Sequence, residues 1–127
     1  MIQSGTYLNV TDNSGSKTVF CIKIITGYRR RYAKIGDLLV VSVKMLRNKR
    51  RSSSKTKKGA VLRALILRTK TNTKQFFGEN LQFFENSVLL LTKQNKIIGS
   101  RLFGSIVKKF RYSNFFRTTT LAPGLID

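Results

Sequence analysis

The sequence contains no histidine, a single cysteine and only five carboxylate side chains among its 127 residues. Without histidine, the chain lacks both the commonest metal ligand and the commonest general base. Cys21 has no second cysteine with which to form an intramolecular disulfide, and its apolar neighbours indicate a small buried side chain. We therefore expect neither a metal site nor a bound cofactor.

The carboxylates are also too scattered for acid–base catalysis. They are Asp12, Asp37, Glu79, Glu85 and Asp127, and no two stand at the spacing of a helical pair or a metal site. Asp12 and Asp37 occupy glycine-containing turns, in which a carboxylate usually accepts backbone N–H groups. No phosphate-binding glycine loop is present. The sequence thus predicts a protein that is not an enzyme.

Long apolar runs and an N-terminal targeting pattern are missing as well. No stretch approaches the length of a membrane span. Met1 is not followed by a charged-then-apolar signal or by an arginine-rich presequence. These features predict a soluble protein without membrane insertion.

What the chain has in abundance is positive charge. Twenty-five Lys and Arg against five acids give a formal net charge of +20. Apolar residues make up 41% of the chain, so the composition is that of one folded domain, residues 1–127, and not of a disordered basic tail. Self-repulsion on this scale favours a polyanionic partner. Nucleic acid is the first candidate and an anionic membrane surface is the second.

The charge is most concentrated between Lys44 and Lys58. This stretch holds eight cations and no acid: Lys44, Arg47, Lys49, Arg50, Arg51, Lys55, Lys57 and Lys58. Apolar runs on both sides predict two strands that hold out a basic loop, residues 46–58. A loop with so much like charge repels itself unless it lies against a polyanion. It is the leading candidate for an RNA contact.

A second candidate is the segment after the first long strand. There, Arg29, Arg30 and Arg31 stand between Tyr28 and Tyr32. Guanidinium groups can fork onto phosphates, and tyrosine rings offer faces on which bases stack. An ordinary exposed turn is the alternative interpretation.

Alternating apolar residues predict short strands at close spacing. They are expected at Tyr7–Val10, Thr18–Ile25, Leu38–Met45 and Gly59–Thr69. In the third of these, Leu39, Val41, Val43 and Met45 share one face; in the fourth, Ala60, Leu62, Ala64 and Ile66 do so. Leu81–Leu91 is broken at Glu85 and is either a hairpin or one kinked strand.

The last quarter of the chain has a helical pattern. Gly104-Ser105 is expected to cap a short helix with an apolar stripe and a basic side that includes Lys108 and Lys109. Asn114 is expected to cap a further turn, and Pro123 to lie beyond regular structure. The fold class is therefore mainly β: a small closed five-stranded β-barrel with a short helical C-terminal part, about residues 104–120.

Collinear motifs run through nearly the whole chain. They are Met1-Ile2-Gln3, Asp12-Asn13-Ser14-Gly15, Arg30-Arg31-Tyr32-Ala33, Gly36-Asp37, Lys57-Lys58-Gly59, Ala64–Lys70 (ALILRTK), Gly99–Gly104 (GSRLFG) and Leu121-Ala122-Pro123. Together they resemble the large-subunit ribosomal protein fourteen family, of the organellar or bacterial type. The resemblance implies a five-stranded barrel that binds large-subunit rRNA and helps to form bridges to small-subunit rRNA.

The resemblance also assigns roles by position. The segment Lys44–Arg51 and Gly99-Ser100-Arg101 are implied to lie on the bridge-forming side. Ordinary rRNA contacts are implied at Arg30, Arg31, Lys57, Lys58, Arg68 and Lys70. A neighbouring large-subunit protein is a further implied partner, and a ribosome-silencing factor is expected on the C-terminal part. The chain departs from the family pattern in its longer Arg47–Thr56 segment and at Gly124, which replaces an acid.

The composition also bears on the compartment and on two alternative classes of protein. Few acids and many Lys, Asn, Ile and Phe favour an AT-rich genome, and with the family-like start they favour the mitochondrial ribosome; a plastid or a bacterial cytoplasm is the alternative. A free RNA-binding barrel would carry stacked aromatics on one strand face, whereas these strands are mostly aliphatic. A membrane-surface protein would need a longer amphipathic helix than Ile106–Tyr112.

Overall fold

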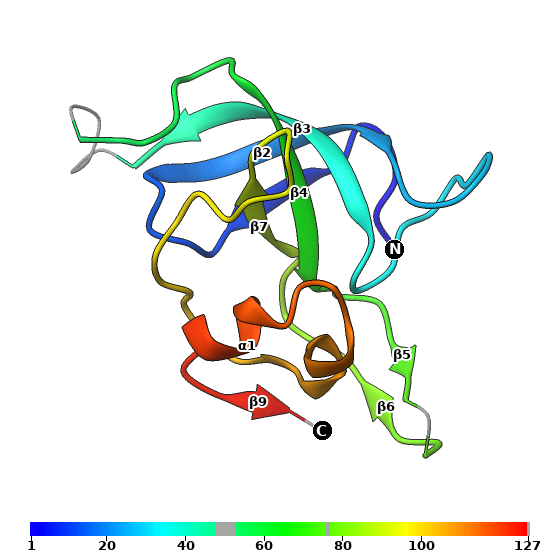
Figure 1. Ribbon diagram of the computed structural model, residues 1–127. Helices are drawn as coiled ribbons and strands as arrows, with labels where there is room; N and C mark the ends of the chain where they lie inside the picture. Colours follow the sequence, from blue (N-terminus) through cyan, green and yellow to red (C-terminus); the bar gives the residue numbers. More distant parts are fainter. Residues whose placement is uncertain (48–52, 76, 127) are drawn as a thin grey trace.

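Five strands of the computed structural model close into a barrel (Figure 1). The structure describes residues 1–47, 53–75 and 77–126. The barrel strands, in order around it, are β1 (Tyr7–Val10), β2 (Ser16–Ile24), β3 (Leu38–Leu46), β4 (Val61–Arg68) and β7 (Ser87–Leu91). Neighbours are antiparallel except β1 and β7, which close the barrel in parallel. The predicted small closed β-barrel is confirmed.

The barrel interior follows the period-two pattern of the strands. Five inward-facing side chains are at most 1% exposed: Leu8, Val19, Cys21, Leu39 and Val41. Cys21 is fully buried among them, and burial raises the pKa of its thiol, so it is the small buried side chain that its neighbours predicted.

The apolar face predicted for β3 is interrupted by a β-bulge in its pairing with β2. Thr18 pairs with Met45, but Val19 pairs with Val43, so β3 has an extra residue there. A bulge breaks the alternation of side chains. Met45, which was expected to share the inner face with Val43, is consequently 52% exposed, and this part of the prediction is wrong.

Strand β4 is buried more completely than a one-sided pattern suggests. Ala64, Leu65, Ile66 and Leu67 are all fully buried. One face lines the barrel, and the other is covered by the C-terminal part, whose strand β8 (Ile106–Val107) packs against β4. The continuous apolar run of this strand therefore reflects burial on both faces.

The stretch Leu81–Leu91 is neither a hairpin nor one kinked strand. Its beginning belongs to β6 (Asn80–Leu81), which pairs with β5 (Thr73–Lys74) in a separate two-stranded sheet. Its end is β7, which pairs with β4 and β1. The polar break therefore carries the chain from the small sheet into the barrel, because the two halves find different partners.

The C-terminal part is less helical than predicted. It begins with β8, continues as the 3₁₀-helix η2 (Lys108–Tyr112) and the helix α1 (Arg117–Leu121), and ends with β9 (Leu125–Ile126). The β-branched pair Ile106-Val107 is extended because it pairs in parallel with β9, beyond Pro123. No side-chain cap opens either helix, so the expected capping is wrong. Within the described residues, no helix is long and apolar enough to cross a membrane.

Candidate RNA interface

The turn between β1 and β2, residues 11–15, is organised by a buried carboxylate. Asp12 is fully buried, and its oxygens accept the backbone N–H groups of Ser14 at 3.0 Å and of Leu90 at 3.2 Å. A carboxylate that is satisfied in this way fixes the turn against β7. This is the backbone-capping role that its glycine-containing turn predicted.

The same turn holds the segment 98–103. The Asn13 side chain accepts the backbone N–H of Ser100 at 2.8 Å and donates to its hydroxyl at 2.9 Å. The backbone N–H of Phe103 donates to the Thr11 carbonyl at 2.8 Å. A Cβ on Gly99 would lie 2.9 Å from the Cβ of Asp12, so glycine alone allows this close approach. Exposed Arg101 is thereby carried on a fixed backbone.

Both limbs of the basic loop are tied to this turn as well. The backbone N–H of Arg47 donates to the Gly15 carbonyl at 2.8 Å, and that of Lys55 to the Ser14 carbonyl at 2.9 Å. The Lys55 ammonium also lies 3.4 Å from the carbonyl of Ile98. The loop limbs and the segment 98–103 therefore meet at one end of the barrel. Lys49, Arg50 and Arg51 lie outside the described residues.

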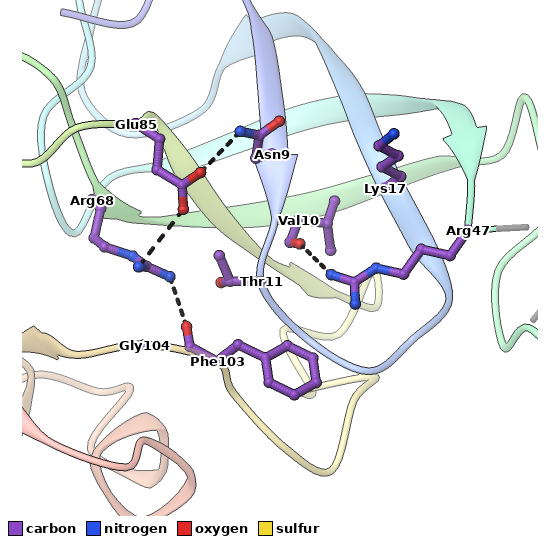
Figure 2. Close-up of a pocket in the computed structure, with 9 residues that line it drawn as sticks. All are labelled: Asn9, Val10, Thr11, Lys17, Arg47, Arg68, Glu85, Phe103 and Gly104. Carbon is purple, nitrogen blue, oxygen red and sulfur yellow. Dashed lines mark hydrogen bonds and ion pairs between the residues drawn. The ribbon is translucent and has the colours of Figure 1, made fainter. Parts of the chain in front are cut away.

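A cleft lies beside this meeting point, over the outer surface of β1 (Figure 2). Arg47 reaches across it and donates to the Val10 carbonyl at 3.2 Å. The guanidinium carbons of Arg47 and Arg101 lie 5.4 and 5.8 Å from the ring centroid of Phe103, within the range of cation–π attraction. Two arginines from distant parts of the sequence are thus gathered on one aromatic ring.

Arg68 closes the other side of the cleft and serves the fold. Its side chain is 13% exposed, donates to the Phe103 carbonyl at 2.7 Å and lies 3.7 Å from Glu85. Burial lowers the pKa of Arg68, although the Glu85 charge opposes this. A Cβ on Gly104 would lie 2.5 Å from the guanidinium, so this close packing also requires a glycine.

Glu85 is held in its charged form by its neighbours. Burial by itself would raise its pKa, but hydrogen bonds from Ser87 and Asn9 and the charge of Arg68 bring the pKa below its usual value. The two hydrogen bonds measure 2.8 and 3.0 Å. The carboxylate therefore offsets the charge of Arg68 and links β1, β4 and β7.

The predicted arginine triplet lies at the opposite end of the β2–β3 pair. There the connection between the two strands projects from the barrel, away from the basic loop (Figure 1). Arg30 forms an ion pair with Asp37 at 3.3 Å, whereas Arg29, with a φ of 51°, lies 5.2 Å from the Tyr28 ring centroid. Arg31 is exposed. The structure therefore separates this triplet from the basic loop.

Comparison of the sequence with known families identifies a match. The sequence matches the family described as ribosomal protein L14p/L23e over residues 1–126. The chain belongs to that family. It is a structural protein of the large ribosomal subunit, and the family is not one of enzymes. The resemblance found in the sequence motifs is confirmed.

In this L14p/L23e chain the remaining predicted cations do not form one continuous site. Exposed Lys44 lies 5.4 Å from the Phe20 ring centroid on the barrel wall. Lys57 and Lys58 are exposed just before β4, and Lys70 just after it. On η2, Lys108 is half-buried and Lys109 exposed. Three groups result: the loop end, the arginine triplet, and the side that carries the C-terminal part.

Sequence reasoning missed Lys17, Glu85 and Phe103, which all line the cleft. Lys17 and Arg47 stand on opposite sides of the Ser16–Leu46 pair of β2 and β3, and both side chains line the cleft. This register includes a bulge, which the sequence pattern does not reveal. The GSRLFG motif did flag the segment of Phe103, but not the ring's contacts. Among the residues that the structure describes, no cluster of three Cys, Asp or Glu could hold a metal ion.

Proposed function

We propose that this chain binds large-subunit rRNA and contributes to bridges with small-subunit rRNA. The bridging role is assigned to the loop-end surface, defined by Lys44, Lys55 and Arg101. Arg47, which leaves the same end of the barrel but reaches into the cleft, is assigned to large-subunit rRNA. Lys49, Arg50 and Arg51, which lie outside the described residues, are proposed to share the bridging role. The observation that supports it is the turn at residues 11–15, which ties the basic loop and the segment 98–103 into one surface. Cations held on a rigid barrel lose less entropy when they dock on phosphates.

The other cations are assigned to large-subunit rRNA. They are Arg29, Arg30, Arg31, Lys57, Lys58, Arg68, Lys70, Lys108 and Lys109. Duplex RNA is recognised largely by shape and by its backbone, which suits exposed cations better than base-specific pockets. Arg30 and Arg68 are assigned an indirect role, because their ion pairs with Asp37 and Glu85 orient them within the protein.

The experiment compares two charge-matched double variants. Lys44→Gln/Arg101→Gln removes two exposed cations of the loop-end surface, and Arg29→Gln/Arg31→Gln removes two exposed cations at the opposite end. We expect the first to enter large subunits normally but to lower the fraction of subunits that join. The second should be washed from large subunits at lower salt and leave joining intact, because it loses phosphate contacts and therefore binds more weakly at every salt concentration.

Sucrose gradients of ribosomes from cells that express each tagged variant measure both properties. Equal effects of the two double variants on joining would contradict the bridging assignment. Wild-type protein that stayed at the top of the gradient would contradict rRNA binding altogether.

The compartment and the remaining partners are part of the same proposal. The low acid content and the many Lys, Asn, Ile and Phe support a mitochondrial ribosome, with a plastid or bacterial ribosome as the alternative. A neighbouring large-subunit protein is a further proposed contact, and a ribosome-silencing factor is assigned to the C-terminal part, residues 104–126. Fractionation of the source cells, followed by detection of the tagged chain, tests the compartment.

A further inference from the structure

The cleft over β1 is large enough to take a small charged group. Its volume is about 380 Å³, within the range of ligand sites. Figure 2 shows Lys17 and Arg47 on one side of β1 and Arg68 and Glu85 on the other, with Phe103 below. The cleft is therefore built from six stretches of the chain that the fold brings together.

The cleft lining carries more positive than negative charge, which favours binding of an anion. Glu85 is the one carboxylate in the lining. It already accepts hydrogen bonds from Asn9 and Ser87 and forms a salt bridge with Arg68. In the described part of the chain, neither Lys17 nor Arg47 forms a salt bridge. Two cations that share a concave surface repel each other, and a bound anion relieves that repulsion.

Arg47 is already oriented for such a ligand. Its guanidinium donates to the Val10 carbonyl and lies over the Phe103 ring. Phe103 in turn is fixed at both ends of its backbone, because its N–H donates to Thr11 and its carbonyl accepts from Arg68. A guanidinium that is held before binding loses less rotamer entropy on binding.

We propose that this cleft binds one phosphate group, and that its occupant is a backbone phosphate of large-subunit rRNA. Lys17 and Arg47 hold the phosphate, and Phe103 is a positioning residue for Arg47. A polyanionic chain suits the cleft better than a free ion, because Arg101 on the same ring extends the positive surface beyond the cleft. The inference rests on the proposed function and adds to it a binding site and its ligand group. It also adds roles for Lys17 and Phe103, which the sequence had not indicated.

Binding of the purified full-length chain to large-subunit rRNA across a salt series tests the site. We expect Lys17→Gln and Arg47→Gln each to weaken binding by roughly tenfold and to lower the salt slope by about one. The double variant should lose less than the product of the two, since both side chains serve one phosphate. Lys23→Gln is the matched control, an exposed lysine of the same strand outside the cleft; it should change affinity less than threefold.

Phe103→Leu separates positioning from charge. It keeps every cation and both backbone hydrogen bonds of residue 103, so we expect weaker rRNA binding with an unchanged salt slope. If Phe103 serves only the fold, its replacement should lower the melting temperature and leave affinity unchanged at temperatures where the chain is folded; that result would overturn the positioning role.

A free-phosphate arm identifies the occupant. Sodium phosphate, matched in ionic strength with sodium chloride, is titrated while the amide resonances of Thr11 and Phe103 are followed. Two results together would assign the cleft to a small anion and overturn the RNA occupant. The phosphate-induced shifts would vanish in Lys17→Gln, and Lys17→Gln would bind rRNA as tightly as Lys23→Gln does. If Lys17→Gln and Lys23→Gln behaved alike both in rRNA binding and in the phosphate titration, the site would be overturned. Wild-type rRNA binding would still stand. Loss of wild-type rRNA binding would contradict the proposed function itself.

Discussion

The two ends of the β2–β3 pair carry similar cations but hold them differently. At the loop end, the backbone of Arg47, Lys55 and Ser100 is hydrogen-bonded to the turn between β1 and β2. At the opposite end, Asp37 fixes Arg30, while Arg29 lies against its own neighbour Tyr28. The first arrangement joins residues that are 32 (Gly15 and Arg47) to 87 (Asn13 and Ser100) positions apart in sequence, and the second is local.

Under the proposed function, the two ends would contribute differently to RNA binding. Cations on a surface with a fixed backbone meet a polyanion in one geometry, so the loop end is suited to an interface that must align two subunits. Cations on a projecting connection supply attraction that depends less on geometry and more on ionic strength.

The largest effect is expected from the aspartates that organise the two ends. Asp12→Ala leaves the buried N–H groups of Ser14 and Leu90 without their acceptor, and should lower the free energy of unfolding by roughly 2–4 kcal/mol. Asp37→Ala is the matched change. It removes a 2.7 Å hydrogen bond from the Lys34 backbone and the Arg30 ion pair, and should cost roughly 1 kcal/mol.

Denaturant titration of the two variants measures the contrast. If Asp37→Ala were as destabilising as Asp12→Ala, the arginine end would be integrated into the barrel as firmly as the loop end. The difference in how the two ends hold their cations would then disappear.

An intermediate effect is expected from pH at the cleft. The pKa of Glu85 is lower in the folded chain than in the unfolded chain, so the folded chain releases this proton more readily. The carboxylate therefore adds stability above its unfolded pKa of about 4.3, and this stability is lost as the pH falls through the lower, folded value. We expect the melting temperature of the wild type to fall more steeply below about pH 4.5 than that of Glu85→Gln.

Thermal melts from pH 7 to pH 3 provide the measurement, with Glu79→Gln, an exposed carboxylate, as the control. Parallel curves for the wild type and Glu85→Gln would show that the Asn9, Ser87 and Arg68 contacts contribute no pH-dependent stability. They would remove the reason for treating Glu85 as fully occupied in the cleft.

Local patterns predicted the parts of this fold that depend on neighbours in sequence. Strand alternation predicted four of the five barrel strands within a few residues but joined β7 to the stretch that contains β6. The glycine turns predicted the backbone-capping role of Asp12. The bulge that turns Met45 outward could not be predicted, because it depends on the register between two strands. The extended form of Ile106-Val107 was hidden for the same reason: its partner β9 lies beyond a proline.

The candidate site was predictable in composition but not in geometry. Charge density identified the basic loop, and the family resemblance placed Arg101 on the same side. Nothing in the sequence indicated that Phe103 gathers Arg47 and Arg101, or that Arg68 would turn inward to hold the carbonyl of that residue. Such contacts arise from the crossing of distant segments, which periodicity and propensity do not encode.

The smallest effect concerns the stability of the free chain. With a net charge of +20, each exposed cation raises the electrostatic free energy of the folded state. Arg31→Gln should therefore stabilise the isolated protein by a few tenths of a kcal/mol at low salt, and the gain should vanish near ~0.5 M salt as screening removes the repulsion.

Arg101→Gln is the comparison, and it should bring no gain. Arg101 gives up its contact with the Phe103 ring, worth about 0.5–1 kcal/mol at an exposed site, which offsets the relief of repulsion. Melting temperatures of both variants across a salt series measure the difference. Equal gains would mean that the ring contact does not hold Arg101, and that only the backbone distinguishes the two ends.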